Sequence, residues 1–185
     1  IHGSPDALTE ILLHAGLIDG AHVWIAANTV LIQTGDVIDR GPDSLGAVAL
    51  LRTLQAQAAA HGSRVVRCCG NHELMLLQRD VRYVDVSDPK ALADQFRHEI
   101  SQGLLQAAYT DGSRLYTHAG LRTVVQDTLV EEIKRAHPSD DARSTSLEAL
   151  ADHINTVFRT AVAEDRCDST HHCIFWVDDA RGGAD

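Results

Sequence analysis

The sequence has no long apolar run, no internal repeat and no low-complexity tract. A membrane-spanning helix needs roughly 20 consecutive apolar residues, and no stretch of this chain approaches that length. We therefore expect no insertion into a membrane. A chain of 185 residues can bury one sizeable core, so we expect a single domain over residues 1–185.

Cysteine and basic residues are also scarce. Four cysteines are too few for a disulfide scaffold at this length, and Cys68 and Cys69 lie in an apolar run that favours core thiols. The chain has 26 acidic residues against 16 basic ones, a formal charge of −10. A nucleic-acid backbone binds a basic face, so we expect no nucleic-acid partner. Phosphate substrates stay possible because bound divalent cations reverse the local field.

Three short polar runs stand out against this background: Gly35–Gly41, Gly70–Glu73 and His118–Leu121. Each run follows an apolar, strand-like stretch. These stretches are Thr29–Thr34, Arg64–Cys69 and Ser113–Thr117. Because α/β folds build their sites where strands end, the Asp, Asn and His side chains of the three runs are candidates for a metal site.

Helical patterns surround these runs. Ser4–Leu17 and Asp43–His61 carry apolar residues at helical spacing, with Pro5 and Gly62 as start and stop signals. The second helix lies between two predicted strands, a crossover that favours parallel strand neighbours. Further helices are expected over Glu73–Gln78, Pro89–Ala107, Thr123–Ala136 and Leu147–Ala163.

The second half of the chain is expected to be mostly helical. Part of the span 89–163 should form an insert or cover over the core, with a polar loop over Pro138–Ser146. A late strand, Ile174–Val177, would deliver Asp178–Arg181 to a loop.

The first run combines a possible metal ligand with a possible phosphate ligand. A carboxylate is a hard oxygen donor that can bridge two cations, which suits Asp36. Arg40 is a planar bidentate donor that matches phosphate oxygens. Taken alone, Asp36, Asp39 and Arg40 fit a salt-bridged surface turn equally well.

The remaining polar residues add an amide and imidazoles. Asn71 offers a neutral oxygen ligand, and His72 can titrate near neutral pH and protonate a leaving oxygen. Each has a simpler alternative, since Gly70-Asn71 is ordinary turn composition. His118 alone fits a structural histidine, and His2 is a weaker signal because it stands at the start of the chain.

In combination, the runs resemble the signature of the phosphoprotein phosphatase family. Its pattern is Gly-Asp-x-His-Gly, Gly-Asp-x-x-Asp-Arg-Gly, Gly-Asn-His-Glu and His-(Gly/Ala)-Gly. The similarity extends from Ile1 to about Leu121, with a weaker match near Arg181, and Asn28–Pro42 is most similar to the Shewanella-like branch. The resemblance implies an α/β metallophosphoesterase-type β-sandwich of two mixed sheets flanked by helices.

The resemblance also implies roles for single residues. Asp36 would bridge two divalent metal ions, and such ligands suit manganese, iron or zinc. The other implied metal ligands are His2, Asn71 and His118. His72 would be the general acid, oriented by Asp39. The implied phosphate-binding arginines are Arg40 and Arg181.

Some features depart from the family pattern. The family places an Asp just before Ile1 and a further ligand histidine late in the chain, so we expect these 185 residues to be part of a longer protein and to show weak or no turnover alone. Arg181 equally fits a solvated loop arginine. Cys167 and Cys173 flank two histidines, but their spacing fits an ordinary polar loop better than a zinc site or a disulfide loop.

Three functions fit these residues. The first is hydrolysis of phosphoserine and phosphothreonine in proteins by a metal-bridging hydroxide, without a phosphoenzyme. The second is hydrolysis of dinucleoside polyphosphates, and the third is a non-catalytic scaffold with a degraded metal site. The expected partner is thus a phosphorylated protein or a small phosphoester. The sequence indicates no oligomeric state, and the cytoplasm is only the default compartment.

Overall fold

The computed structural model describes residues 1–121, 123–136 and 146–166. In chain order the elements are α1 (Pro5–His14), β1 (Val30–Gln33), α2 (Ser44–Ala58), the short 3-10 helix η1 (Ala59–His61), β2 (Arg64–Arg67), α3 (Asn71–Leu77), α4 (Pro89–Ser101), β3 (Ala108–Thr110), β4 (Leu115–Thr117), α5 (Thr123–Ala136) and α6 (Leu147–Ala163). No helix in these ranges is long and apolar enough to cross a membrane. The predicted strand Ile174–Val177 lies outside the described residues.

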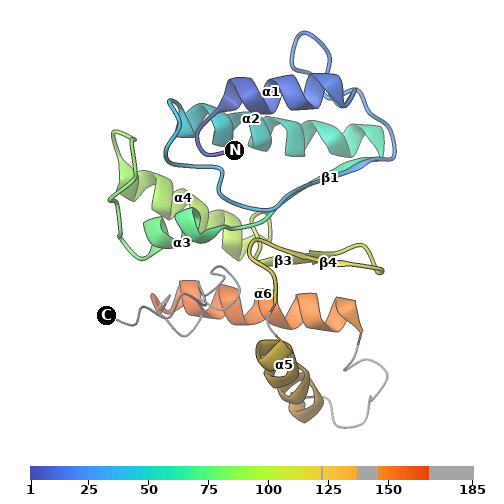
Figure 1. Ribbon diagram of the computed structural model, residues 1–185, viewed down its shortest axis with the longest axis vertical. Coiled ribbons are helices and arrows are strands. Elements are labelled where there is room, and N and C mark those ends of the chain that lie inside the picture. Colours follow the sequence, from blue (N-terminus) through green and yellow to red (C-terminus); the bar gives the residue numbers. More distant parts are fainter. Residues whose placement is uncertain (122, 137–145, 167–185) are drawn as a thin grey trace, which may run out of the picture.

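The first half of the chain forms the predicted strand–helix–strand unit. β1 and β2 pair in parallel, with Val30 opposite Arg64. The Asp43 side chain caps α2 by accepting a hydrogen bond from the Gly46 N–H, at 2.7 Å. α2 packs on β2, and α1 lies alongside α2 above β1 (Figure 1). The crossover therefore places the ends of β1 and β2 next to each other.

The second half combines three helices with a hairpin. α6 packs against both β3 and α5, and α4 contacts α3 and α6 (Figure 1). β3 and β4 are antiparallel, and the Asp111 carboxylate closes their turn by accepting the Ser113 and Arg114 N–H groups, both at 2.8 Å. The predicted helix Pro89–Ala107 is too long. α4 ends at Ser101 because Gly103 takes a left-handed φ of 71°, and the chain then turns into β3.

Within the described residues, the strands form two separate pairs, β1–β2 and β3–β4. One isolated parallel bridge, between Cys68 and Gln106, connects the end of β2 to the segment that leads into β3. The α/β character of the fold is therefore clear, whereas the sandwich of two mixed sheets stays a prediction. The same holds for the cover over 89–163, a span that includes the β3–β4 hairpin as well as helices.

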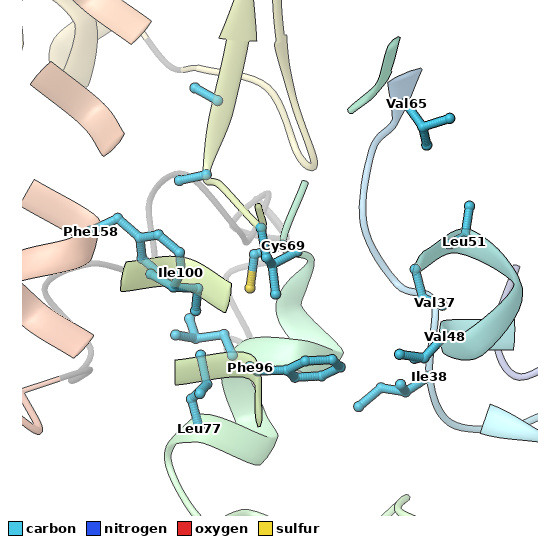
Figure 2. Packing of buried hydrophobic residues seen from close by; sticks show 14 of the residues in the cluster. Val37, Ile38, Val48, Leu51, Val65, Cys69, Leu77, Phe96, Ile100 and Phe158 are labelled. Atoms are coloured by element: carbon cyan, nitrogen blue, oxygen red, sulfur yellow. The ribbon is translucent and has the colours of Figure 1, made fainter. Parts of the chain in front are cut away.

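One apolar cluster joins the two halves. Figure 2 shows Phe96 of α4 directed toward Val37 and Ile38, which belong to the loop after β1. Cys68 and Cys69 are fully buried, as predicted for core thiols. Burial raises the pKa of the Cys68 thiol to about 12, so this group is protonated and a poor nucleophile at neutral pH.

A buried ion pair also connects the halves. Arg67 at the end of β2 donates a 2.9 Å hydrogen bond from Nη2 to Oε2 of Glu99 in α4, and its Nε donates to Gln55 Oε1 at 3.0 Å. Burial lowers the pKa of Arg67, and the Glu99 carboxylate opposes that shift. Glu99 also pairs with Arg52 of α2, whereas Arg67 has Glu99 as its carboxylate partner. Because removing Glu99 would leave the buried Arg67 charge unpaired, this pair fixes α4 relative to β2.

Candidate active site

The three polar runs meet around the carboxylate of Asp36. Asp36 follows β1, Asn71 begins α3 just after β2, and His118 follows β4. His118 Nε2 lies 2.9 Å from Asn71 Oδ1 and 3.5 Å from Asp36 Oδ1. On the other side, His2 Nε2 lies 3.5 Å from Asp36 Oδ2. Each Asp36 oxygen thus faces a different histidine, an arrangement that suits a carboxylate bridging two cations.

The His118 side fits a cation. His118 Nδ1 lies 2.9 Å from the Thr34 carbonyl oxygen, which can only accept, so Nδ1 carries a proton. In the neutral ring, Nε2 then presents a lone pair to the oxygens of Asn71 and Asp36. Three electron-pair donors that face one another are stabilised by a shared cation, and Asp, Asn and His are ligands for manganese, iron or zinc.

The His2 side also fits a cation. Ligand atoms of His2, Asp36 and His72 all lie within 4.8 Å of one another. His2 Nδ1 is buried and has no hydrogen-bond partner among the described residues. A cation here would use Nε2, the nitrogen that faces Asp36. The unpaired Nδ1 is a separate buried polar atom of the same ring, and such atoms are usually satisfied.

His72 and Asp39 form a buried pair beside these ligands. His72 Nδ1 lies 2.7 Å from Asp39 Oδ2, and both side chains are only 1% exposed. The His72 ring meets the His2 ring edge to face, with centroids 5.0 Å apart. Because a carboxylate accepts the Nδ1 proton, Nε2 is the nitrogen left for chemistry in the site.

The loops that carry these residues are conformationally strained. Four non-glycine residues of the site have left-handed φ values: 50° at His2, 56° at Asp36, 70° at Asp39 and 63° at Arg40. Such conformations cost of order 1–3 kcal/mol each and persist only where the surroundings impose them. Strain concentrated at one place is typical of a functional site.

Two glycines allow the first two runs to approach each other. A Cβ atom on Gly35 would lie 2.6 Å from the Gly70 backbone and 2.8 Å from His118 Nδ1. A Cβ on Gly70 would lie 2.3 Å from Asp36 Oδ1. All three distances are shorter than side chains tolerate, so only glycine fits at either position.

Glu73 contributes to the site in a way that the sequence analysis missed. Its carboxylate, 1% exposed, accepts N–H hydrogen bonds from Asp36 at 2.8 Å, Val37 at 2.8 Å, Ile38 at 3.2 Å and Gly70 at 2.8 Å. This one side chain therefore fastens the first run to the second. An acidic residue in the first turn of α3 was a visible signal, but its partners 35–37 positions away were not.

Tyr83 was missed as well. It lies in the segment between α3 and α4, outside all three runs. Its ring centroid lies 5.7 Å from that of His72 and 5.8 Å from the Arg40 guanidinium carbon. Arg40 itself is exposed. An aromatic ring therefore borders both the predicted acid and the predicted phosphate ligand.

The other predicted site residue and the cysteine–histidine segment cannot be placed. Arg181 and the segment Cys167–Cys173 lie outside the described residues. Their suggested roles stay predictions. The residues that the structure brings together are His2, Asp36, Asp39, Arg40, Asn71, His72 and His118.

Two of three proteins with similar sequences carry phosphatase names. The chain is 37% identical over 84 residues to Shewanella-like protein phosphatase 2 of Arabidopsis thaliana, a match that covers 45% of this chain and 22% of that protein. It is 37% identical over 99 residues to Shewanella-like protein phosphatase 1 of Plasmodium berghei, covering 54% and 26%. An uncharacterized protein of Schizosaccharomyces pombe is 47% identical over 91 residues, covering 48% and 27%. These matches span about a quarter of each relative's length.

Solved structures with a similar fold carry a related name. A cold-active protein-tyrosine phosphatase of a psychrophilic Shewanella species superposes with a TM-score of 0.66 at 25% identity, covering 95% of this chain and 52% of that one. A point mutant of a cold-active protein tyrosine phosphatase gives a TM-score of 0.67, also at 25% identity and with the same coverage. This chain thus corresponds to about half of each solved protein.

A family model decides the assignment. The model for the calcineurin-like phosphoesterases matches residues 1–174, most of the chain. It agrees with the phosphatase names of the relatives and with the resemblance that the motifs carry. The chain, with its His, Asp and Asn side chains gathered around Asp36, belongs to the calcineurin-like phosphoesterase family.

Proposed function

We propose that this chain carries most of the active site of a metal-dependent protein phosphatase with two metal ions. One observation carries the proposal: the Asp36 carboxylate lies between His2 and the pair Asn71–His118. When bound there, divalent cations would lower the pKa of water and neutralise phosphate charge. The scaffold alternative lacks a comparable reason for four candidate ligands to face one another.

The neighbouring residues supply binding and proton transfer. Asp39 holds the Nδ1 proton of His72, so that Nε2 faces the site and can protonate the departing alkoxide. Arg40 offers two parallel N–H donors to the phosphate oxygens. The hydrogen bonds of Glu73 keep the two loops in register, which maintains the distances between these groups.

Phosphoproteins are the proposed substrates. The relatives are named protein phosphatases, which favours a protein-bound phosphoester over a dinucleoside polyphosphate. The motifs led us to expect phosphoserine and phosphothreonine. Phosphotyrosine is a second candidate, because the similar solved structures are named protein-tyrosine phosphatases.

The substrate is tested with the complete protein and added manganese. Three peptides that differ only in phosphoserine, phosphothreonine or phosphotyrosine, and one dinucleoside polyphosphate, are compared by kcat/KM. Release of phosphate from a peptide supports the proposal. Turnover of the dinucleotide alone would favour the second function, and bound metal without any turnover would favour a scaffold.

The metal bridge is tested by Asp36→Asn. Residues that only hydrogen-bond to metal ligands typically contribute about 10–100-fold, so we expect loss of a bridging ligand to lower activity by at least about 100-fold. The metal content measured by mass spectrometry should fall as well. Asp43→Asn is the matched control, since Asn caps α2 as well as Asp does. Unchanged metal content in Asp36→Asn would exclude the bridging role.

A further inference from the structure

Tyr83 contacts the site from a segment that none of the motifs includes. The residue is 49% exposed, and its two site neighbours come from different parts of the chain, His72 at the start of α3 and Arg40 in the loop after β1. The Arg40 guanidinium carbon lies 5.8 Å from the ring centroid, which is within the range of a cation–π contact. Tyr83 therefore borders the groups proposed to bind phosphate and to donate the proton.

The residues before and after Tyr83 have contacts that restrain the backbone of this segment. The Asp80 N–H donates to the Met75 carbonyl oxygen at 2.8 Å, and the Asp80 carboxylate accepts two N–H groups of Arg82 at 2.7–2.9 Å. On the other side, Val84 packs against the apolar core. The Arg82 guanidinium carbon also lies 5.8 Å from the ring centroid, so two guanidinium groups border the Tyr83 ring.

Arg40 needs such support. It is exposed and sits on a strained left-handed backbone, at a φ of 63°. A free arginine side chain loses much rotamer freedom when it binds an anion. A ring that restricts the guanidinium beforehand reduces that loss.

We propose that Tyr83 is a positioning residue, whose ring holds the Arg40 guanidinium ready for the substrate phosphate. This role rests on the proposed function, because it presupposes that Arg40 binds phosphate. It predicts that Tyr83 acts on phosphate affinity and not on the chemical step, and that the ring matters more than the hydroxyl.

The experiment measures the dissociation constant of inorganic phosphate by calorimetry, and KM and kcat for a phosphopeptide, in the complete metal-loaded protein. We expect Tyr83→Leu to weaken phosphate binding and raise KM by about two- to fivefold, the size of an exposed cation–π contact. kcat should stay the same. Tyr83→Phe keeps the ring and should behave like the wild type.

Two further variants locate the effect. Val81→Ala changes another exposed side chain of the same segment and should alter neither quantity. In an Arg40→Ala background, Tyr83→Leu should have no further effect on phosphate binding, since its target is gone.

Several results would overturn the role. They are normal phosphate affinity in Tyr83→Leu, a fall in kcat alone, or the same loss in the Arg40→Ala background. If the wild type binds no phosphate, the proposed function fails and this role with it. Wild-type binding that Tyr83→Leu leaves unchanged overturns the role of Tyr83 only.

Discussion

The loops around Asp36 and the helical half of the chain differ in backbone conformation and in how their buried polar groups are bound. In the loops, four residues adopt left-handed backbone conformations, and a carboxylate is buried against N–H groups instead of a cation. From α4 to residue 166, the one described non-glycine residue with positive φ is Asp165, which follows α6. The buried Asn155 there binds only backbone groups of the β3 strand region.

This difference separates what stabilises the fold from what prepares the site. The helical half buries apolar side chains in regular, capped helices, with Ser146 and Asp88 as N-caps. The loops instead hold polar atoms close together on a strained backbone. Backbone hydrogen bonds and glycines must offset the free-energy cost of that strain. Changes in the loops should therefore affect activity first, and changes in the helices should affect stability first.

The largest expected effect should distinguish the His72–Asp39 pair of the site from the His153–Glu132 pair of the helical half. His72→Asn removes the proposed acid and should lower kcat for an alkyl phosphoester by about 100- to 10,000-fold. An aryl ester with a good leaving group needs less protonation and should lose far less. The matched control is His153→Asn, since His153 Nε2 lies 2.9 Å from Glu132 Oε2 in the helical half. Equal losses for both esters would argue against acid catalysis by His72.

Glu73→Gln should affect both stability and the site. A Gln amide would present an N–H group to backbone donors, and the unmet hydrogen bonds should destabilise the protein by about 3 kcal/mol. Urea unfolding measures this change, and metal titration should show weaker binding because the Asp36 loop loosens. Full metal affinity in a destabilised variant would show that Glu73 serves only the fold.

Asn155→Ala should affect stability alone. Asn155 Oδ1 accepts the N–H groups of Ala107 at 2.8 Å and Ala108 at 3.0 Å, and Nδ2 donates to the Ala108 carbonyl oxygen at 2.8 Å. Loss of these bonds in the core should destabilise the protein by about 1–2 kcal/mol in urea unfolding. Below the unfolding transition, metal affinity and kcat should match the wild type. A loss of either in the folded variant would show that the helical half also affects the site.

The smallest expected effect is a pH dependence in the β3–β4 hairpin. Tyr116 Oη and Ser113 donate to the Asp111 carboxylate and lower its pKa. A lowered carboxyl pKa stabilises the folded state above the ordinary value near 4, and this contribution disappears as the pH falls further. Tyr116→Phe removes one donor, so the pKa of Asp111 should rise in an NMR titration, with no change in turnover at neutral pH.

The sequence predicted the elements around the site well, because their signals are local. Apolar periodicity and end signals located α1, α2, α5 and α6 within a few residues, and β1 and β2 lie inside the predicted stretches. β3 was missed because three residues carry little pattern. It forms because β4 supplies its hairpin partner and because Asn155, 47 positions away, bonds the backbone of Ala108.

For the site, residue types and order were enough to name the candidates but not their supports. Asp36, Asn71 and His118 were recognisable because their combination and order resemble a known family signature, although each residue alone fits a structural role. Glu73 and Tyr83 were not, since a carboxylate that binds backbone N–H groups and a ring that flanks a guanidinium leave no pattern in spacing.

By itself, the sequence therefore determined the family, the parallel crossover and the identity of the candidate ligands, all of which depend on local patterns and residue chemistry. Only the tertiary structure decided that each oxygen of Asp36 faces a different histidine, and that Glu73 ties the loops together. These relations join residues up to 82 positions apart, such as Asp36 and His118, and they arise only when packing of the strands and helices brings the loops together.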